Sequence, residues 1–76
     1  MTLIDATIEK TLRVSLIDSG EIAKRSLINL GIQVDDKLVK LNMGKRGPVL
    51  IKNMSNGAFK VAIGRGLADK IQVEYE

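Results

Sequence analysis

The residues that could carry chemistry in this chain of 76 residues are few, and two of the most reactive types are absent. The sequence contains no histidine and no cysteine. Without histidine, no side chain titrates near neutral pH unless its surroundings perturb its pKa. The serines, such as Ser15 and Ser26, therefore lack the base that usually activates a hydroxyl nucleophile. The sequence predicts that the protein is not an enzyme, and it offers no catalytic residues.

Carboxylates and glycines are the remaining candidates for a reactive or metal-binding site. Asp35 and Asp36 are adjacent, so on a strand they would face opposite sides, and we interpret them as a solvated turn. The acidic residues never form the dense acidic loop of a calcium site, and imidazole and thiolate ligands for ferrous iron are missing. Gly64 and Gly66 precede no full helix, which favours turns over a phosphate loop. We expect no metal site and no cofactor.

Charge and composition restrict the partners and the compartment. Lysine and arginine number 12 against 9 acidic residues, a net charge of +3, and the basic residues are scattered along the chain. Only Phe59 and Tyr75 are aromatic, too few for stacking on single strands, so we expect no nucleic-acid binding. No apolar stretch approaches the ~20 residues that cross a bilayer, and the first residues lack the basic region of an export signal. We expect a cytoplasmic protein without direct membrane insertion.

One helix is expected near the start of the chain, after a strand over residues 7–17. Leu12, Val14 and Leu16 alternate with polar residues, as on a half-buried strand. Asp18 and Glu21 have the spacing of a capping box, and Gly31 sits where a left-handed residue would end a helix. One face of this helix is expected to be buried, and its members are Ile22, Ala23, Ser26, Leu27 and Leu30.

The rest of the chain predicts short strands separated by turns. The strands are expected over residues 37–41, 49–54, 58–63 and 71–75, with a glycine-rich loop over residues 42–48. Asn56-Gly57 suits a tight hairpin turn because both residue types accept positive φ angles, and residues 67–69 suit a single helical turn. The prediction is a mainly β fold with one inserted helix in the order β-α-β-β-β-β, closed into a small barrel that fills residues 1–76 as a single domain.

Two stretches of the sequence resemble the ferrous iron transport protein A (FeoA) family. They are KRSLINLGI at residues 24–32 and GRGLADKIQV at residues 64–73, and Gly47-Pro48 is similar to the loop that precedes the central hairpin of that family. The sequence departs from the family pattern after the helix, where Val34-Asp35 replaces a common Pro-Gly. The resemblance implies an SH3-like β-barrel.

The resemblance also implies a function and a partner. It implies a cytosolic accessory or regulatory protein of bacterial ferrous iron uptake, which binds the cytosolic GTP-binding region of the membrane iron transporter B. We expect the partner contacts on the outward side of the helix and on the charged loop, with weak self-association as a further option. The expected contact residues are Lys24, Arg25, Ile28, Asn29, Lys45 and Arg46. Alternatively, Ile28 packs beneath a neighbouring loop.

Two other functions remain open at this point. A basic barrel module could bind RNA or the ribosome, and would place on phosphates the residues Lys37, Lys40, Lys45, Arg46, Lys52 and Lys60. A direct ferrous chaperone would instead bind the ion itself, with a stoichiometry measurable by anaerobic calorimetry.

Overall fold

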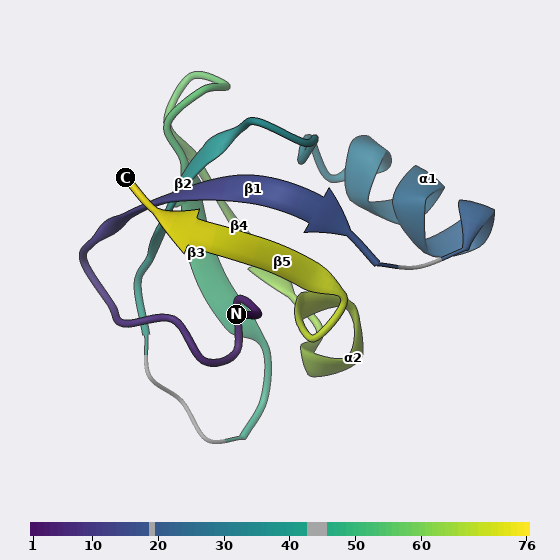
Figure 1. Cartoon of the computed structure of the whole chain (residues 1–76), viewed down its shortest axis with the longest axis horizontal. Coiled ribbons are helices and arrows are strands. Elements are labelled where there is room, and N and C mark those ends of the chain that lie inside the picture. The colour runs from purple at the N-terminus through teal and green to yellow at the C-terminus, as the bar shows by residue number, and fades with distance from the viewer. Residues whose placement is uncertain (19, 43–45) are drawn as a thin grey trace.

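The fold is an antiparallel five-stranded sheet with one nine-residue helix and one short helix. Figure 1 shows the computed structural model, in which residues 1–18, 20–42 and 46–76 are described. The strands lie in the order β4-β3-β2-β1-β5, and every neighbouring pair is antiparallel. The elements are β1 (Thr11–Ile17), α1 (Glu21–Asn29), β2 (Lys37–Lys40), β3 (Val49–Asn53), β4 (Phe59–Ile63), α2 (Arg65–Ala68) and β5 (Ile71–Tyr75).

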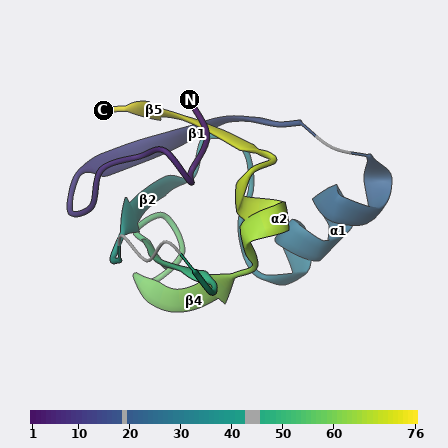
Figure 2. The same cartoon turned by 90° about the horizontal axis from the view of Figure 1, so that it is seen from below.

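The sheet curls around its core, and the short helix α2 joins the two outermost strands β4 and β5 (Figure 2). This arrangement confirms the predicted element order and is consistent with an SH3-like barrel. The core contains apolar side chains from every element and from the N-terminal segment. They are Leu3, Ala6, Leu12, Val14, Ile17, Leu27, Ile32, Leu38, Val49, Ile51, Ile63, Ala68, Ile71 and Val73.

The N-terminal segment, which the sequence left without a structural role, covers the outer edge of β5. The Leu3 amide donates to the Ile71 carbonyl at 2.9 Å, and the Val73 amide donates to the Met1 carbonyl at 2.8 Å. Lys40 is 4% exposed, and its Nζ donates to the carbonyls of Ile4 at 2.6 Å and Ala6 at 3.1 Å. A buried lysine therefore fastens this segment to the core, because its ammonium satisfies two carbonyls that would otherwise lack donors.

Strand β1 is shorter than predicted and contains a bulge. It begins at Thr11 rather than at residue 7. Val14 pairs with Val73 and Leu16 with Gln72, so two steps on β1 correspond to one step on β5. The extra residue reverses the side on which the following side chains point. Ile17 is therefore buried while Leu16 is 53% exposed, and the prediction that Leu16 faces the core is wrong.

Helix α1 is present as predicted, but its N-terminal cap and its buried face differ from the prediction. Its N-cap is Gly20, with no side-chain hydrogen bond, so the predicted capping box of Asp18 and Glu21 does not form. Leu27 is the only helix residue that is buried, and Ile22 is 86% exposed. The first turn of α1 extends past the end of the sheet (Figure 1), so Ile22 has nothing to pack against. The other members of the predicted buried face besides Leu27, which are Ala23, Ser26 and Leu30, are half-buried.

The turns show which residues adopt left-handed backbone. Gly31 has φ +86° directly after the helix C-cap, which confirms the prediction for it. The β3–β4 hairpin forms, but its connection spans residues 54–58, and Gly57 and Ala58 have the positive φ angles instead of Asn56. The Asn53 Oδ1 accepts from the Ser55 amide at 3.0 Å and so shapes the start of this wider turn.

Candidate functional site

An apolar groove lies between the end of β1, one side of α1 and the segment that follows the helix. It has a volume of about 250 Å³ and is lined by Leu16, Ile17, Lys24, Ile28, Gln33 and Val34. Three of its apolar side chains remain largely open to solvent: Leu16 at 53%, Ile28 at 55% and Val34 at 47% exposure. Because large apolar side chains gathered from three segments are unusual on a free surface, this α1 groove is the candidate site.

Each of the three side chains is held in place by a different backbone feature. The bulge in β1 turns Leu16 outward. Val34 is placed beside it because the Asp35 amide donates to the Val14 carbonyl at 2.8 Å, with Asp35 at φ +74°. Ile28 lies one helical turn after Lys24, so both reach the groove from the same face of α1.

The two aspartates expected in a solvated turn hold the segment below the groove. Asp35 is exposed and forms an ion pair with Arg13 at 3.1 Å. Asp36 is half-buried, and its Oδ2 accepts from the Gln33 amide at 2.9 Å and from the Asn53 Nδ2 at 3.0 Å. The turn is therefore confirmed, but Asp36 has a structural role that the sequence did not indicate.

The charge of the groove is one-sided. Among the described residues that line it, Lys24 is the only charged one, Gln33 is the only neutral polar one, and none is a carboxylate. Such a surface suits a partner that inserts an apolar side chain and places a negative group near Lys24. The described residues hold no cluster of three or more histidine, cysteine or acidic side chains that could bind a metal ion.

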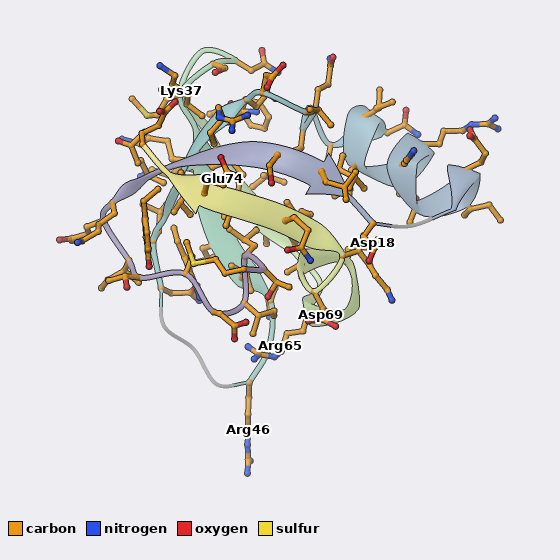
Figure 3. The ribbon with its side chains drawn as sticks, viewed as in Figure 1. Asp18, Lys37, Arg46, Arg65, Asp69 and Glu74 are labelled. Carbon is orange, nitrogen blue, oxygen red and sulfur yellow. The ribbon has the colours of Figure 1, made fainter. Side chains whose placement is uncertain are left out.

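The structure brings together only some of the predicted contact residues. Lys24 and Ile28 line the groove, while Arg25 and Asn29 are exposed on α1 without reaching it. Arg46 is exposed on the β2–β3 connection and points away from the fold, well apart from α1 (Figure 3). Lys45 lies outside the described residues.

Leu16 and Val34 are groove residues that the sequence reasoning missed. A signal for Leu16 was present, because the adjacent pair Leu16-Ile17 must place one side chain on each face of a strand. The alternation of apolar and polar residues predicted that Leu16, rather than Ile17, faces the core. It did so because the apolar pattern gives no sign of a bulge. Val34 carried no signal beyond being an apolar residue in a turn.

The basic surface required for RNA binding is incomplete among the lysines proposed for it. Lys40 is buried, and burial lowers the pKa of its ammonium below the ordinary value. Its Nζ is engaged by the carbonyls of Ile4 and Ala6, so it cannot reach a phosphate. Lys37 forms an ion pair with Glu76 at 3.6 Å. The assignment of Lys40 to phosphate binding is therefore wrong.

A second, more open hollow of about 530 Å³ lies on the other side of α1. Its lining comes from the start of α1 and from α2, and consists of Gly20, Glu21, Ile22, Ala23, Ser26 and Leu67.

Across the described ranges of the chain, no helix has the length and apolar character needed to span a membrane.

Comparison with known proteins identifies the family. Residues 1–75 match the model of the FeoA domain. A protein of Methanocaldococcus jannaschii with the provisional name Fe(2+) transport protein A is 44% identical over 61 residues, which span 80% of this chain and 70% of that protein.

Solved structures agree with this assignment. The crystal structure of an iron uptake regulatory protein (FeoA) superposes with a TM-score of 0.89 at 25% identity, covering 100% of this chain and 97% of that one. The solution structure of iron(II) transport protein A from Clostridium thermocellum shares the fold, with a TM-score of 0.79 at 22% identity over 99% of this chain and 45% of that one. The chain therefore belongs to the FeoA family, which is associated with ferrous iron transport.

Proposed function

We propose that this protein is a cytoplasmic accessory and regulatory component of ferrous iron uptake, which acts by docking on the cytosolic GTP-binding region of the membrane iron transporter. The observation that carries the proposal is the α1 groove, where three exposed apolar side chains surround a volume of about 250 Å³ beside Lys24. Family membership supports the link to ferrous iron transport.

The energetics of the groove suit a reversible contact. Fully burying a leucine, isoleucine or valine side chain contributes roughly 1.5–3 kcal/mol. Leu16, Ile28 and Val34 are each about half exposed, so covering all three would contribute roughly 2–5 kcal/mol before the cost of association. A contact of this size needs support from other surfaces, which fits a partner that binds and releases.

The proposal also states how the ion is handled. Ferrous iron is the cargo of the transporter, and this chain acts on the transporter without binding the ion. Anaerobic titration calorimetry of the isolated protein with ferrous iron should give no binding heat beyond dilution. Stoichiometric binding would instead support a direct chaperone.

The test of docking compares two matched substitutions on opposite sides of α1. Ile28→Asp places a carboxylate in the groove, whereas Ile22→Asp makes the same change at an 86% exposed position that does not line it. Binding to the purified cytosolic region of the transporter is measured by biolayer interferometry, with and without guanine nucleotide.

Ile28→Asp should weaken binding at least tenfold, because it replaces an apolar contact with a carboxylate that is costly to bury and that competes with the partner for Lys24. Ile22→Asp should bind as the wild-type protein does. Equal binding by the wild-type protein and Ile28→Asp would contradict the groove as the contact, and absence of any binding by the wild-type protein would contradict the proposed function itself.

A further inference from the structure

The outer face of the sheet carries two lysines opposite each other on β3 and β4. Lys52 pairs in register with Lys60, so their side chains leave the sheet on the same side. Like charges in directly opposed positions repel each other and destabilise the pair. All of the acidic residues are within the described part of the chain, and none of its ion pairs involves either lysine.

The other half of the same face is neutralised. Arg13 on β1 contacts both Asp35 and Glu74, and Lys37 on β2 contacts Glu76. Lys37 and Glu74 lie on the side of the sheet near the C-terminus (Figure 3). The sheet therefore has a charge-balanced half at β1 and β5, and an uncompensated positive half at β3 and β4.

The uncompensated half coincides with the open edge of the sheet. Strand β4 is the last strand in the sheet order, and β3 is its only strand partner among the described residues. Within the described residues, 59–63 make backbone hydrogen bonds to no segment other than β3, whereas the opposite edge strand β5 is covered by Met1 and Leu3. In Figure 2, β4 lies at the lower rim of the molecule. Its outward amides and carbonyls are thus a template for a further strand.

An apolar pair lies next to the lysine pair on the same face. Leu50 pairs with Ala62 two residues away along each strand, and both are exposed, Leu50 at 42%. Along β4 the outer face therefore alternates a positive and an apolar position at Lys60 and Ala62. A strand added to this edge would meet the same alternation on its own outer face.

We propose that the edge of β4 binds an extended segment of a partner protein that carries acidic and apolar side chains in turn at every second residue, so that both kinds lie on one face. The backbone of the segment adds a sixth strand, its carboxylates lie beside Lys60 and its apolar side chains beside Ala62, with Lys52 and Leu50 one strand further in. Backbone pairing supplies affinity and the charge pairing supplies selectivity. This surface is separate from the α1 groove, and the proposal stands independently of the proposed function.

A second copy of this chain is a poorer occupant than a foreign segment. The chain has an acidic strand of its own at Val73-Glu74-Tyr75-Glu76, but this strand places both glutamates on one face with no apolar residue between them. It is also already paired with β1, and both glutamates are held in ion pairs. Self-association through it would require the C-terminal strand to leave the sheet.

The test uses a soluble peptide with the repeat Thr-Glu-Thr-Val, which places glutamate and valine in turn on one face of a strand, titrated into the full chain and followed by amide NMR. The expected result is saturable shifts at residues 59–63 together with slower hydrogen exchange of the outward β4 amides. A peptide of equal composition with a central proline should bind at least tenfold more weakly, because proline interrupts the added strand.

Charge reversal separates binding from folding. Lys60→Glu replaces a repulsive pair with an attractive one opposite Lys52, so its melting temperature should equal or exceed that of the wild-type protein, while its affinity for the peptide falls at least tenfold. Lys24→Glu, which alters the α1 groove, serves as the matched control and should leave peptide affinity unchanged. Peptide shifts away from β4, equal affinity in Lys60→Glu, tighter binding of an RNA oligonucleotide at the same lysines, or dimerisation through β4 would each overturn the proposal.

Discussion

The sheet and helix α1 use their apolar residues in opposite ways. In the sheet, the inward side chains of β1, β2 and β3 are almost completely buried, and Leu12, Leu38 and Ile51 are 0% exposed. In α1, Leu27 alone is buried, while Ile22 and Ile28 face solvent. The difference shows that stability and recognition depend on different regions. The sheet and the N-terminal segment stabilise the fold, whereas the helix leaves apolar side chains exposed to solvent and available to a partner.

The largest expected effect is a cavity in the sheet core. Ile51→Ala removes most of a side chain that is 0% exposed on the interior strand β3. Large-to-small substitutions at such positions cost about 2–5 kcal/mol, a large part of the stability of so small a domain. Chemical denaturation monitored by circular dichroism should show the loss. A shift smaller than that of a surface substitution would contradict the placement of Ile51 in the core.

The junction between helix and sheet is the next most sensitive position. Gly31 has φ +86°, and a Cβ there would lie 2.7 Å from Cζ of Phe59. Gly31→Ala should cost about 1–2 kcal/mol for the left-handed backbone alone, with the clash added to it. Gly57→Ala is the matched control, since Gly57 also has a positive φ of +68° but no atom within 4 Å of an added Cβ. An equal loss in both variants would show that Phe59 does not crowd Gly31.

Lys40 should give a stability difference that depends on pH. In the folded chain, burial lowers the pKa of Lys40 below its ordinary value of 10.5. Between the two pKa values the unfolded chain binds more protons than the folded one, so the contribution of Lys40 to stability increases as the pH rises through this window. Denaturation of the wild-type protein and Lys40→Met from neutral pH up to 10.5 should show the wild-type protein gaining relative to the variant. A falling difference would mean that the folded protein stabilises the charged form.

The smallest expected effect lies on the first turn of α1. Ile22→Asp changes a residue that is 86% exposed, and it adds a carboxylate near the helix N-terminus, where the helix dipole favours negative charge. The free energy of unfolding should change by no more than about 0.5 kcal/mol in either direction. A loss comparable to that of Ile51→Ala would place Ile22 in the core after all and remove the contrast between sheet and helix.

The order of elements and most of the core could be predicted from the sequence, because alternation and helical periodicity report which residues seek burial. Leu12 and Val14 were expected to face inward, and the structure buries both of them. The positive φ at Gly31 also followed from residue type. The absence of histidine and cysteine already excluded the most reactive chemistry.

Only the tertiary structure decided which apolar residues remain available for binding. The outward turn of Leu16 depends on a bulge that arises between β1 and β5, strands separated by most of the chain. The exposure of Ile22 depends on how far α1 extends past the sheet, and the burial of Lys40 depends on carbonyls from the N-terminal segment. The local sequence pattern indicates whether a side chain favours burial or solvent. Whether it is in fact buried in the folded chain depends on contacts with residues far away in the sequence.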